Sequence, residues 1–228
     1  MGIDTINEEL KAAFKKKNIE YYPIKSATPE EFYKAIEQAK QINPHGAFVT
    51  KHSIEEYSKM RLFLTLDGKA GIAITEDNNI VSIFNGGEKR GVLKTLLPLA
   101  IQKGGRKLDN YNSGKLSAMY ELYGFNPISQ TKFNSQFAPD DWNYERDGEP
   151  SIVFWIHNGD SAEDVILNFG RYDVPWSIVQ EFDTYEQAEE YRDNIIEEID
   201  KNEISNNWFC SYDYKIIHNV KEKDAIVW

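Results

Sequence analysis

The sequence contains a single cysteine, Cys210, among 228 residues. One cysteine excludes a disulfide within the chain, and without neighbouring partners it cannot anchor a structural zinc ion. The four histidines stand at positions 45, 52, 157 and 218 without the spacing of metal ligands, so we expect no metal site. The sequence also lacks a Gly-x-Ser-x-Gly elbow and a Walker loop, which argues against hydrolases and nucleotidases of those classes.

Positive charge is in the minority, because 26 Lys and Arg stand against 37 Asp and Glu and give a formal net charge of −11. Nucleic-acid affinity comes largely from Lys and Arg, so we expect no nucleic-acid partner. The acidic balance suits a cationic small molecule or a basic protein surface instead. No apolar run approaches the ~18 residues that span a bilayer, and the chain begins with a charged helical pattern instead of an apolar signal region. We therefore expect no membrane partner and a cytoplasmic location.

Aromatic residues are abundant, at 13% of the chain, and supply the bulky side chains of a buried core. Apolar residues at helical spacing predict helices over 5–17, 28–42, 53–60, 90–103, 113–123 and 185–201. Alternating or continuous short apolar runs predict strands over 46–50, 62–66, 70–75, 80–84, 107–111, 128–133, 151–157 and 177–182, with one or two more over 208–220. Pro98 predicts that the helix over 90–103 is bent or begins late.

This order of elements predicts an α/β protein of the α+β type, with a mixed, mainly antiparallel sheet flanked by helices. We expect N-terminal helices over 1–42, a core over 43–158 and a small C-terminal β-α-β appendage over 159–228. An appendage of about 50 residues is too small to bury its own apolar surface. We therefore expect it to dock on the preceding domain or on a second subunit, as in a homodimer.

Two local motifs carry a resemblance to a known family. The first is the strand 80–84, which leads through a glycine break into Glu-Lys-Arg-Gly-Val-Leu at 88–93. The second is the helix end Ala-Met-Tyr-Glu-Leu-Tyr-Gly-Phe at 118–125. With the antiparallel meander before them, they resemble the GCN5-related N-acetyltransferase (GNAT) fold, and residues 43–157 look like the acetyltransferase-like proteins of bacteriophage genomes. The chain departs from the family's pyrophosphate loop at Glu88, where the family has Gln or Arg, and at Leu93, where it has a small residue.

The resemblance implies an N-acetyltransferase that passes an acetyl group from acetyl-coenzyme A (acetyl-CoA) directly to the amine of a small molecule or protein. A backbone N–H of the strand 80–84 would polarise the thioester carbonyl, and Tyr120 would protonate the leaving thiolate. The expected cofactor-binding residues are Ile83, Lys89, Arg90, Gly91, Val92, Leu93, Lys94, Asn112 and Ser113. Independently of the family, a glycine break at a helix start offers unpaired N–H groups and the positive end of the helix dipole to a pyrophosphate.

Several alternatives stay open at this point. Tyr120 lies near one helical stripe with Leu116 and Met119 and is equally suited to a core position, while Asn112 or Ser113 could cap the helix that follows. The candidates for a general base are Glu76, Asp77 and Asp109, for which turn and cap roles are the alternative. The alternative function is a catalytically inactive GNAT-like binding protein, such as a phage-encoded modulator of a host protein in the bacterial cytoplasm.

Overall fold

The computed structural model describes residues 4–87, 90–172, 176 and 179–201. Within them, the helices are α1 (Glu8–Lys16), α2 (Pro29–Ile42), α3 (Ile54–Tyr57), α4 (Leu93–Gln102), α5 (Lys115–Glu121), α6 (Tyr144–Asp147), α7 (Ala162–Leu167) and α8 (Tyr185–Lys201). The strands are β1 (Ile24–Ser26), β2 (Arg61–Thr65), β3 (Ala70–Ile74), β4 (Ile80–Asn85), β5 (Lys107–Tyr111), β6 (Phe125–Thr131), β7 (Ile152–His157) and β8 (Gln180–Phe182).

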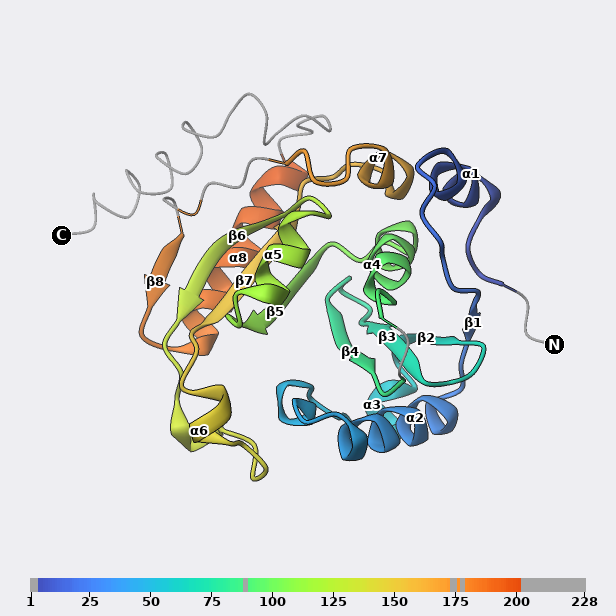
Figure 1. Cartoon of the computed structure of the whole chain (residues 1–228). Helices are drawn as coiled ribbons and strands as arrows, with labels where there is room; N and C mark the ends of the chain where they lie inside the picture. Colours follow the sequence, from blue (N-terminus) through green and yellow to red (C-terminus); the bar gives the residue numbers. More distant parts are fainter. Residues whose placement is uncertain (1–3, 88–89, 173–175, 177–178, 202–228) are drawn as a thin grey trace.

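The strands form two four-stranded sheets (Figure 1). The first sheet has the order β1-β2-β3-β4 and is antiparallel throughout. The second has the order β5-β7-β6-β8, in which only the pair β6 and β8 runs parallel. Mainly antiparallel pairing with flanking helices makes this an α+β protein, which confirms the expected fold class at that level.

Local sequence signals account for the helix that covers the first sheet. Thr28 and Glu31 form a capping box at the start of α2, and Pro29 occupies the first turn, where its missing N–H costs nothing. Phe32 and Ile36 recur at helical spacing and are fully buried against the sheet. The expected helix over 28–42 is therefore confirmed.

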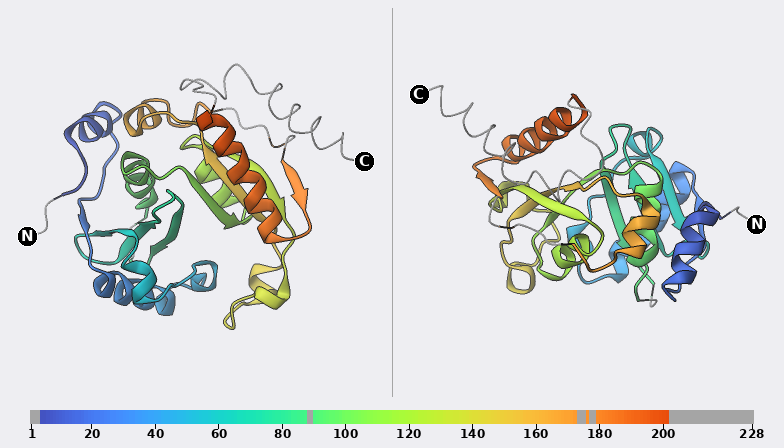
Figure 2. Two further views of the ribbon diagram at one scale, coloured as in Figure 1. Left: turned by 180° about the vertical axis from the view of Figure 1, so that it is seen from behind. Right: turned by 90° about the horizontal axis from the view of Figure 1, so that it is seen from above.

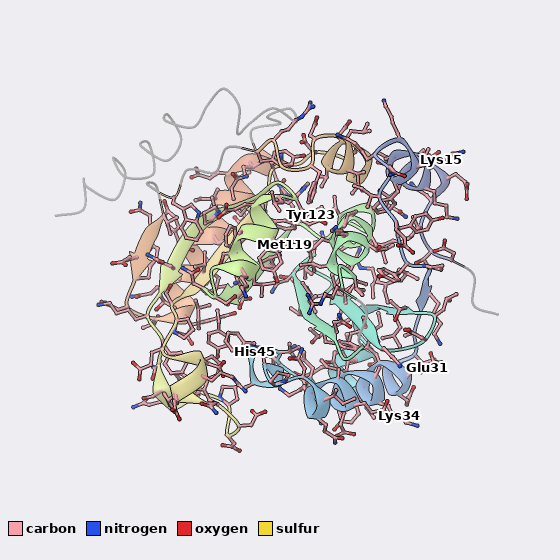
Figure 3. All side chains as sticks on the ribbon, viewed as in Figure 1. Lys15, Glu31, Lys34, His45, Met119 and Tyr123 are labelled. Carbon is pink, nitrogen blue, oxygen red and sulfur yellow. The ribbon has the colours of Figure 1, made fainter. Side chains whose placement is uncertain are left out.

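Helices cover both faces of each sheet. The first sheet lies between α2 and α3 on one face and α4, with α1 and α7 beside it, on the other (Figure 1). The second sheet has α5 on one face and α8 on the opposite face: α5 is in front in Figure 1, and α8 is in front in the reversed view of Figure 2. One apolar core runs under α1, α4, α5 and α7, and Met119 and Tyr123 fill its part between α4 and α5 (Figure 3).

The two sheets meet along the edge strands β4 and β5. A single parallel bridge joins Asn79 to Lys107 at the start of these strands, and no ladder between β4 and β5 follows it among the described residues. Each strand therefore turns an edge with unpaired backbone groups toward the other.

Residues 180–201 belong to the second sheet. Strand β8 pairs with β6, and α8 lies across β6 and β7, where Ile195 packs against Ile128 and Ile156. The expected docking of the C-terminal part is thus confirmed for these residues. The strands expected over 208–220 lie outside the described residues.

One expected strand is wrong. Residues 46–50 do not pair with a sheet, and Gly46–Phe48 form a 3-10 helix instead. The cause is a tertiary contact, because the ammonium group of Lys40 at the end of α2 donates to the carbonyl oxygens of Gly46 and Val49 at 2.8 and 2.6 Å. These bonds hold residues 46–49 against the end of α2, so the segment does not extend into a strand.

Short elements were not foreseen. Strand β1 and the helices α6 and α7 have three to six residues each, too few for a periodic pattern to register. Helix α4 begins at Leu93 rather than at residue 90, which confirms the late start predicted from Pro98.

Candidate functional site

A pocket of about 480 Å³ opens where the edges of β4 and β5 separate. It is built from several parts of the chain that are distant in sequence. Its lining residues are Phe48, Val49, Thr50 and His52 before α3; Thr75, Asn79 and Ile80–Ile83 around β4; Asp109, Asn110 and Tyr111 of β5; Leu116 and Tyr120 of α5; and Phe137, Ile152 and Tyr185 at the rim.

Strand β4 carries a β-bulge inside this pocket. The register with β3 shifts between the pairs of Gly71 with Phe84 and Ala73 with Val81, and Ser82 has a φ of 51°. The Ser82 hydroxyl donates to the carbonyl oxygen of Thr50 at 2.9 Å, which anchors the bulge to the opposite wall. A bulge leaves an extra residue outside the ladder and re-aims its backbone groups, so β4 can present a backbone N–H to the pocket.

Tyr120 combines a core ring with an accessible hydroxyl. The residue is 3% exposed, and its ring lies 5.9 Å from the ring of Trp155. Its hydroxyl borders the pocket and forms no hydrogen bond with any residue that the structure describes. Burial, helped by the negative charge of Asp109, raises the pKa of Tyr120. The phenol therefore stays protonated and is free to donate a hydrogen bond to a ligand.

Asp109 is the carboxylate in the wall of the pocket. Burial raises its pKa, while the Arg192 guanidinium and a hydrogen bond from the Tyr185 hydroxyl act in the opposite direction. The other two candidates for a base, Glu76 and Asp77, are exposed and do not line the pocket, and Asp77 forms an ion pair of 2.7 Å with Lys107.

The expected cofactor-binding residues that the structure describes fall into three places: the pocket, the start of α4 and the start of α5. Ile83 lies in the pocket with Tyr120, whereas the expected residues from Arg90 to Lys94 do not line it. Arg90, Gly91 and Lys94 are exposed at the start of α4, and Lys89 lies outside the described residues.

The start of α4 retains free donors. Its N-cap, Val92, makes no side-chain capping bond, and Gly91 has a φ of 80°, a conformation that glycine tolerates best. Val92 is buried and borders a second cavity of about 350 Å³ beside the β2–β3 hairpin, while Leu93 packs against the core. The N–H groups of Lys94 and Thr95 already donate to the carbonyl oxygens of Gly91 and Val92. The N–H groups left for an anion within the described residues are therefore those just before them, with the side chains of Arg90 and Lys94 beside them.

Asn112 and Ser113 have local contacts at the start of α5. The Asn112 side-chain oxygen accepts from the Ser117 hydroxyl at 3.0 Å, and the Ser113 hydroxyl accepts from the backbone N–H of Leu116 at 3.3 Å. These bonds fix the first turn of the helix that carries Tyr120. Neither residue lines the pocket.

The aromatic wall of the pocket and His52 could not be found from the sequence. The rings of Phe48 and Tyr111 meet edge to face with centroids 5.4 Å apart, and His52 lies with Nδ1 3.7 Å from a carboxylate oxygen of Glu56. His45, by contrast, lies away from the pocket between α2 and α6, where it contacts Asp147 (Figure 3). No spacing in the sequence distinguishes His52 from the other histidines, because its place in the pocket wall depends on how the segment before α3 packs, where the His52 backbone N–H donates to the Tyr57 hydroxyl at 3.2 Å.

The described residues hold no cluster of three or more His, Cys, Asp or Glu side chains suited to a metal ion. None of the described helices is both long and apolar enough to cross a membrane. Comparisons of the chain with protein-family models, curated proteins and solved structures find no match. Any functional assignment therefore depends on the pocket and on the two motifs.

Proposed function

We propose that this protein is a GNAT-like N-acetyltransferase that transfers an acetyl group from acetyl-CoA directly to an amine. The observation that carries the proposal is one pocket holding both the bulge of β4 and the free hydroxyl of Tyr120. These are the backbone strand and the side chain that the resemblance assigns to the reaction.

The separated edges of β4 and β5 suit an extended donor. Their unpaired N–H and C=O groups can bond to the amide groups of a pantetheine arm, much as a peptide adds to a sheet edge. The start of α4, with Arg90 and Lys94, lies beyond the last residues of β4 and offers donors to a pyrophosphate. The residues present therefore fit acetyl-CoA, which would supply the acetyl group as a thioester.

The chain's own groups would act on the acetyl carbonyl and on the sulfur. A backbone N–H at the bulge would donate to the carbonyl oxygen, where negative charge develops, a contribution that is about 10²–10³-fold in rate for one such donor. The Tyr120 hydroxyl would donate to the thiolate as it leaves. Rigid packing of the Tyr120 ring against Trp155 would hold that hydroxyl in place.

Titration of the full chain with acetyl-CoA tests the proposal. A ligand at ~100 times its dissociation constant stabilises the folded state by about 2.7 kcal/mol, so we expect a clear rise in melting temperature and saturable heat in calorimetry. Arg90→Ala with Lys94→Ala should weaken binding at least several-fold, since charge-assisted bonds to phosphate are lost. Lys34→Ala, an exposed lysine on α2, is the matched control (Figure 3). No binding by the wild-type protein contradicts the proposal.

The second candidate is a catalytically inactive GNAT-like binding protein, such as a phage-encoded modulator of a host protein. The observation that favours it is the separation of Arg90, Gly91 and Lys94 from the pocket, together with Glu88 in a phosphate-binding motif. This candidate predicts no effect of acetyl-CoA in the same titration. In both cases we propose the cytoplasm as the location, and that of the bacterial host if the protein is phage-encoded.

A further inference from the structure

We propose that Asp109 receives the acceptor amine and takes up its proton, on the face of the split sheet opposite to Tyr120. The inference rests on the proposed acetyltransferase function and adds to it a base and a class of acceptor.

Strand geometry places Asp109 and Tyr120 on opposite faces. Side chains alternate along β5, and residues paired directly across two antiparallel strands share a face. Asp109 pairs with Phe154, and the centroids of the Phe154 ring and the Tyr185 ring of α8 are 4.8 Å apart. The neighbouring pair, Leu108 with Trp155, faces α5, where Trp155 contacts Tyr120.

Both side chains nevertheless line one pocket, because β5 is an edge strand whose neighbour β4 has separated from it. A thioester lying in that gap would be reached by Tyr120 from the α5 face and by an amine from the α8 face. Two substrates can therefore enter without competing for the same space, as direct transfer requires.

The surroundings of Asp109 favour a carboxylate that can gain and lose a proton. Burial raises its pKa, and Glu189 of α8 adds to this. The Arg192 guanidinium and the Tyr185 hydroxyl lower it in part. A carboxylate with a raised pKa takes up a proton more readily than an ordinary aspartate. Burial raises the pKa values of Tyr111 on the same strand and of Tyr120 on α5, and the negative charge of Asp109 adds to both shifts.

Arg192 forms its hydrogen bonds with groups other than Asp109, so it does not occupy the Asp109 carboxylate. The guanidinium is fully buried and donates to Asp193 at 2.8 Å, to Glu189 at 3.4 Å and to the carbonyl oxygen of Leu108 at 3.5 Å. Its planar group also lies 5.4 Å from the centre of the Phe154 ring. The Tyr185 hydroxyl donates to the Asp109 carboxylate, and no other hydrogen bond to this carboxylate forms within the described residues, so lone pairs are left for a ligand.

The wall beside Asp109 indicates the class of acceptor. Tyr111, two residues along β5, shares the face of Asp109, and Phe48 and Phe137 line the same pocket. Phe137 is 76% exposed, so it lies at the entrance. A carboxylate with aromatic rings beside it suits a primary amine on an apolar or aromatic group, since the rings bind both the group and its ammonium.

The ammonium of the acceptor gives one proton to the Asp109 carboxylate, and the free amine forms a C–N bond with the acetyl carbon. The C–S bond then breaks, and the thiolate takes a proton from the Tyr120 hydroxyl. The tyrosinate regains a proton from the new amide nitrogen, and Asp109 releases its proton to solvent, so that one proton leaves in each turnover.

The test measures release of the coenzyme A thiol with benzylamine and n-butylamine as acceptors between pH 6 and 10. Asp109→Asn keeps the shape of the side chain and should lower kcat/KM for benzylamine about 10²-fold at pH 7. The remaining rate should rise about tenfold per pH unit, because only amine that is already neutral reacts. The affinity for acetyl-CoA, measured by calorimetry, should not change. We expect benzylamine to be preferred over n-butylamine several-fold.

Two further variants guard against misfolding. Tyr185→Phe removes a hydrogen bond to the charged carboxylate, so it should move the acidic limb of the pH profile to higher pH while turnover persists. Glu76→Gln alters an exposed carboxylate outside the pocket and should keep the wild-type profile. Melting temperatures of all variants report whether the fold is intact.

The outcomes separate the two proposals. If Asp109→Asn binds acetyl-CoA and keeps the wild-type rate and pH profile, the role of Asp109 is wrong. The proposed acetyltransferase function is not affected by that result. A wild-type protein that binds acetyl-CoA but acetylates neither amine overturns the acceptor class. Absence of acetyl-CoA binding by the wild type overturns the proposed function, and this inference with it.

Discussion

The hydroxyl of Tyr57 lies 3.1 Å from the hydroxyl of Ser82, the residue with positive φ at the bulge of β4. The same Tyr57 hydroxyl accepts from the backbone N–H of His52 at 3.2 Å. One buried side chain of α3 thus holds both the bulge and the segment that forms the facing wall of the pocket. The shape of the pocket depends on this tyrosine although Tyr57 itself does not line it.

Replacing Tyr57 by Phe should therefore destabilise the protein by about 1–3 kcal/mol, because the backbone N–H of His52 and the Ser82 hydroxyl lose a buried partner. Urea unfolding monitored by circular dichroism measures the change. Tyr21→Phe is the matched control, since the Tyr21 ring stacks on Phe14 and its hydroxyl has no hydrogen bond within the described residues. Equal stability of the two variants would contradict the role assigned to Tyr57.

Tyr120→Phe should lower acetyl transfer by roughly 10²-fold without changing the melting temperature. The ring and its packing remain, and the lost hydroxyl bonds to no described residue. Tyr123→Phe is the control, because its hydroxyl is buried with no hydrogen-bond partner among the described residues. Removing that hydroxyl should leave turnover unchanged and keep or raise the melting temperature. Unaltered turnover in Tyr120→Phe would assign Tyr120 to the core alone.

We expect the buried His157 to lower the free energy of unfolding in mild acid. Burial lowers its pKa from 6.5 to about 4 in the folded chain. Between these values the unfolded chain binds a proton that the folded chain does not, so the contribution is complete above pH 6.5 and is lost as the pH falls toward 4. The loss amounts to about 3 kcal/mol.

Urea unfolding at several pH values between 7.5 and 4.5 measures this loss. His157→Gln has no titrating group and keeps an acceptor for the backbone N–H of Gly159, which bonds to Nδ1 of His157 at 3.3 Å. The free energy of unfolding of the variant should decline less than that of the wild type over the same pH range. Parallel curves for the two proteins would show that other groups cause the acid sensitivity.

Ile195→Ala should destabilise the protein by about 2–5 kcal/mol, since Ile195 is 2% exposed and joins α8 to Ile128 and Ile156 of the second sheet. Ile42→Ala at the end of α2, where the side chain is 70% exposed, should change stability by less than about 0.5 kcal/mol. Thermal and urea unfolding of both variants check the difference. A loss confined to a separate, lower transition would show that α8 unfolds independently of the sheets.

The sequence alone determined the elements whose signals are local. The capping box of Thr28 and Glu31 and the apolar period of α2 lie within a few residues of one another, so they act before any tertiary contact forms. The strands 62–66, 70–75 and 80–84 were recognised for the same reason, from their alternation and the turn residues between them. The two motifs around β4 and α5 also pointed to Tyr120 and Ile83, which the structure brings into one pocket.

Tertiary structure decided what depends on residues far apart. Residues 180–201 join the second sheet because their apolar face packs against Ile128 and Ile156. The pocket itself exists because β5 pairs with β7 and leaves the edge of β4 unpaired. Asp109 and Tyr120 lie on opposite faces of that gap as a consequence of strand register, which is set by the burial of a whole face and which no short window of sequence encodes.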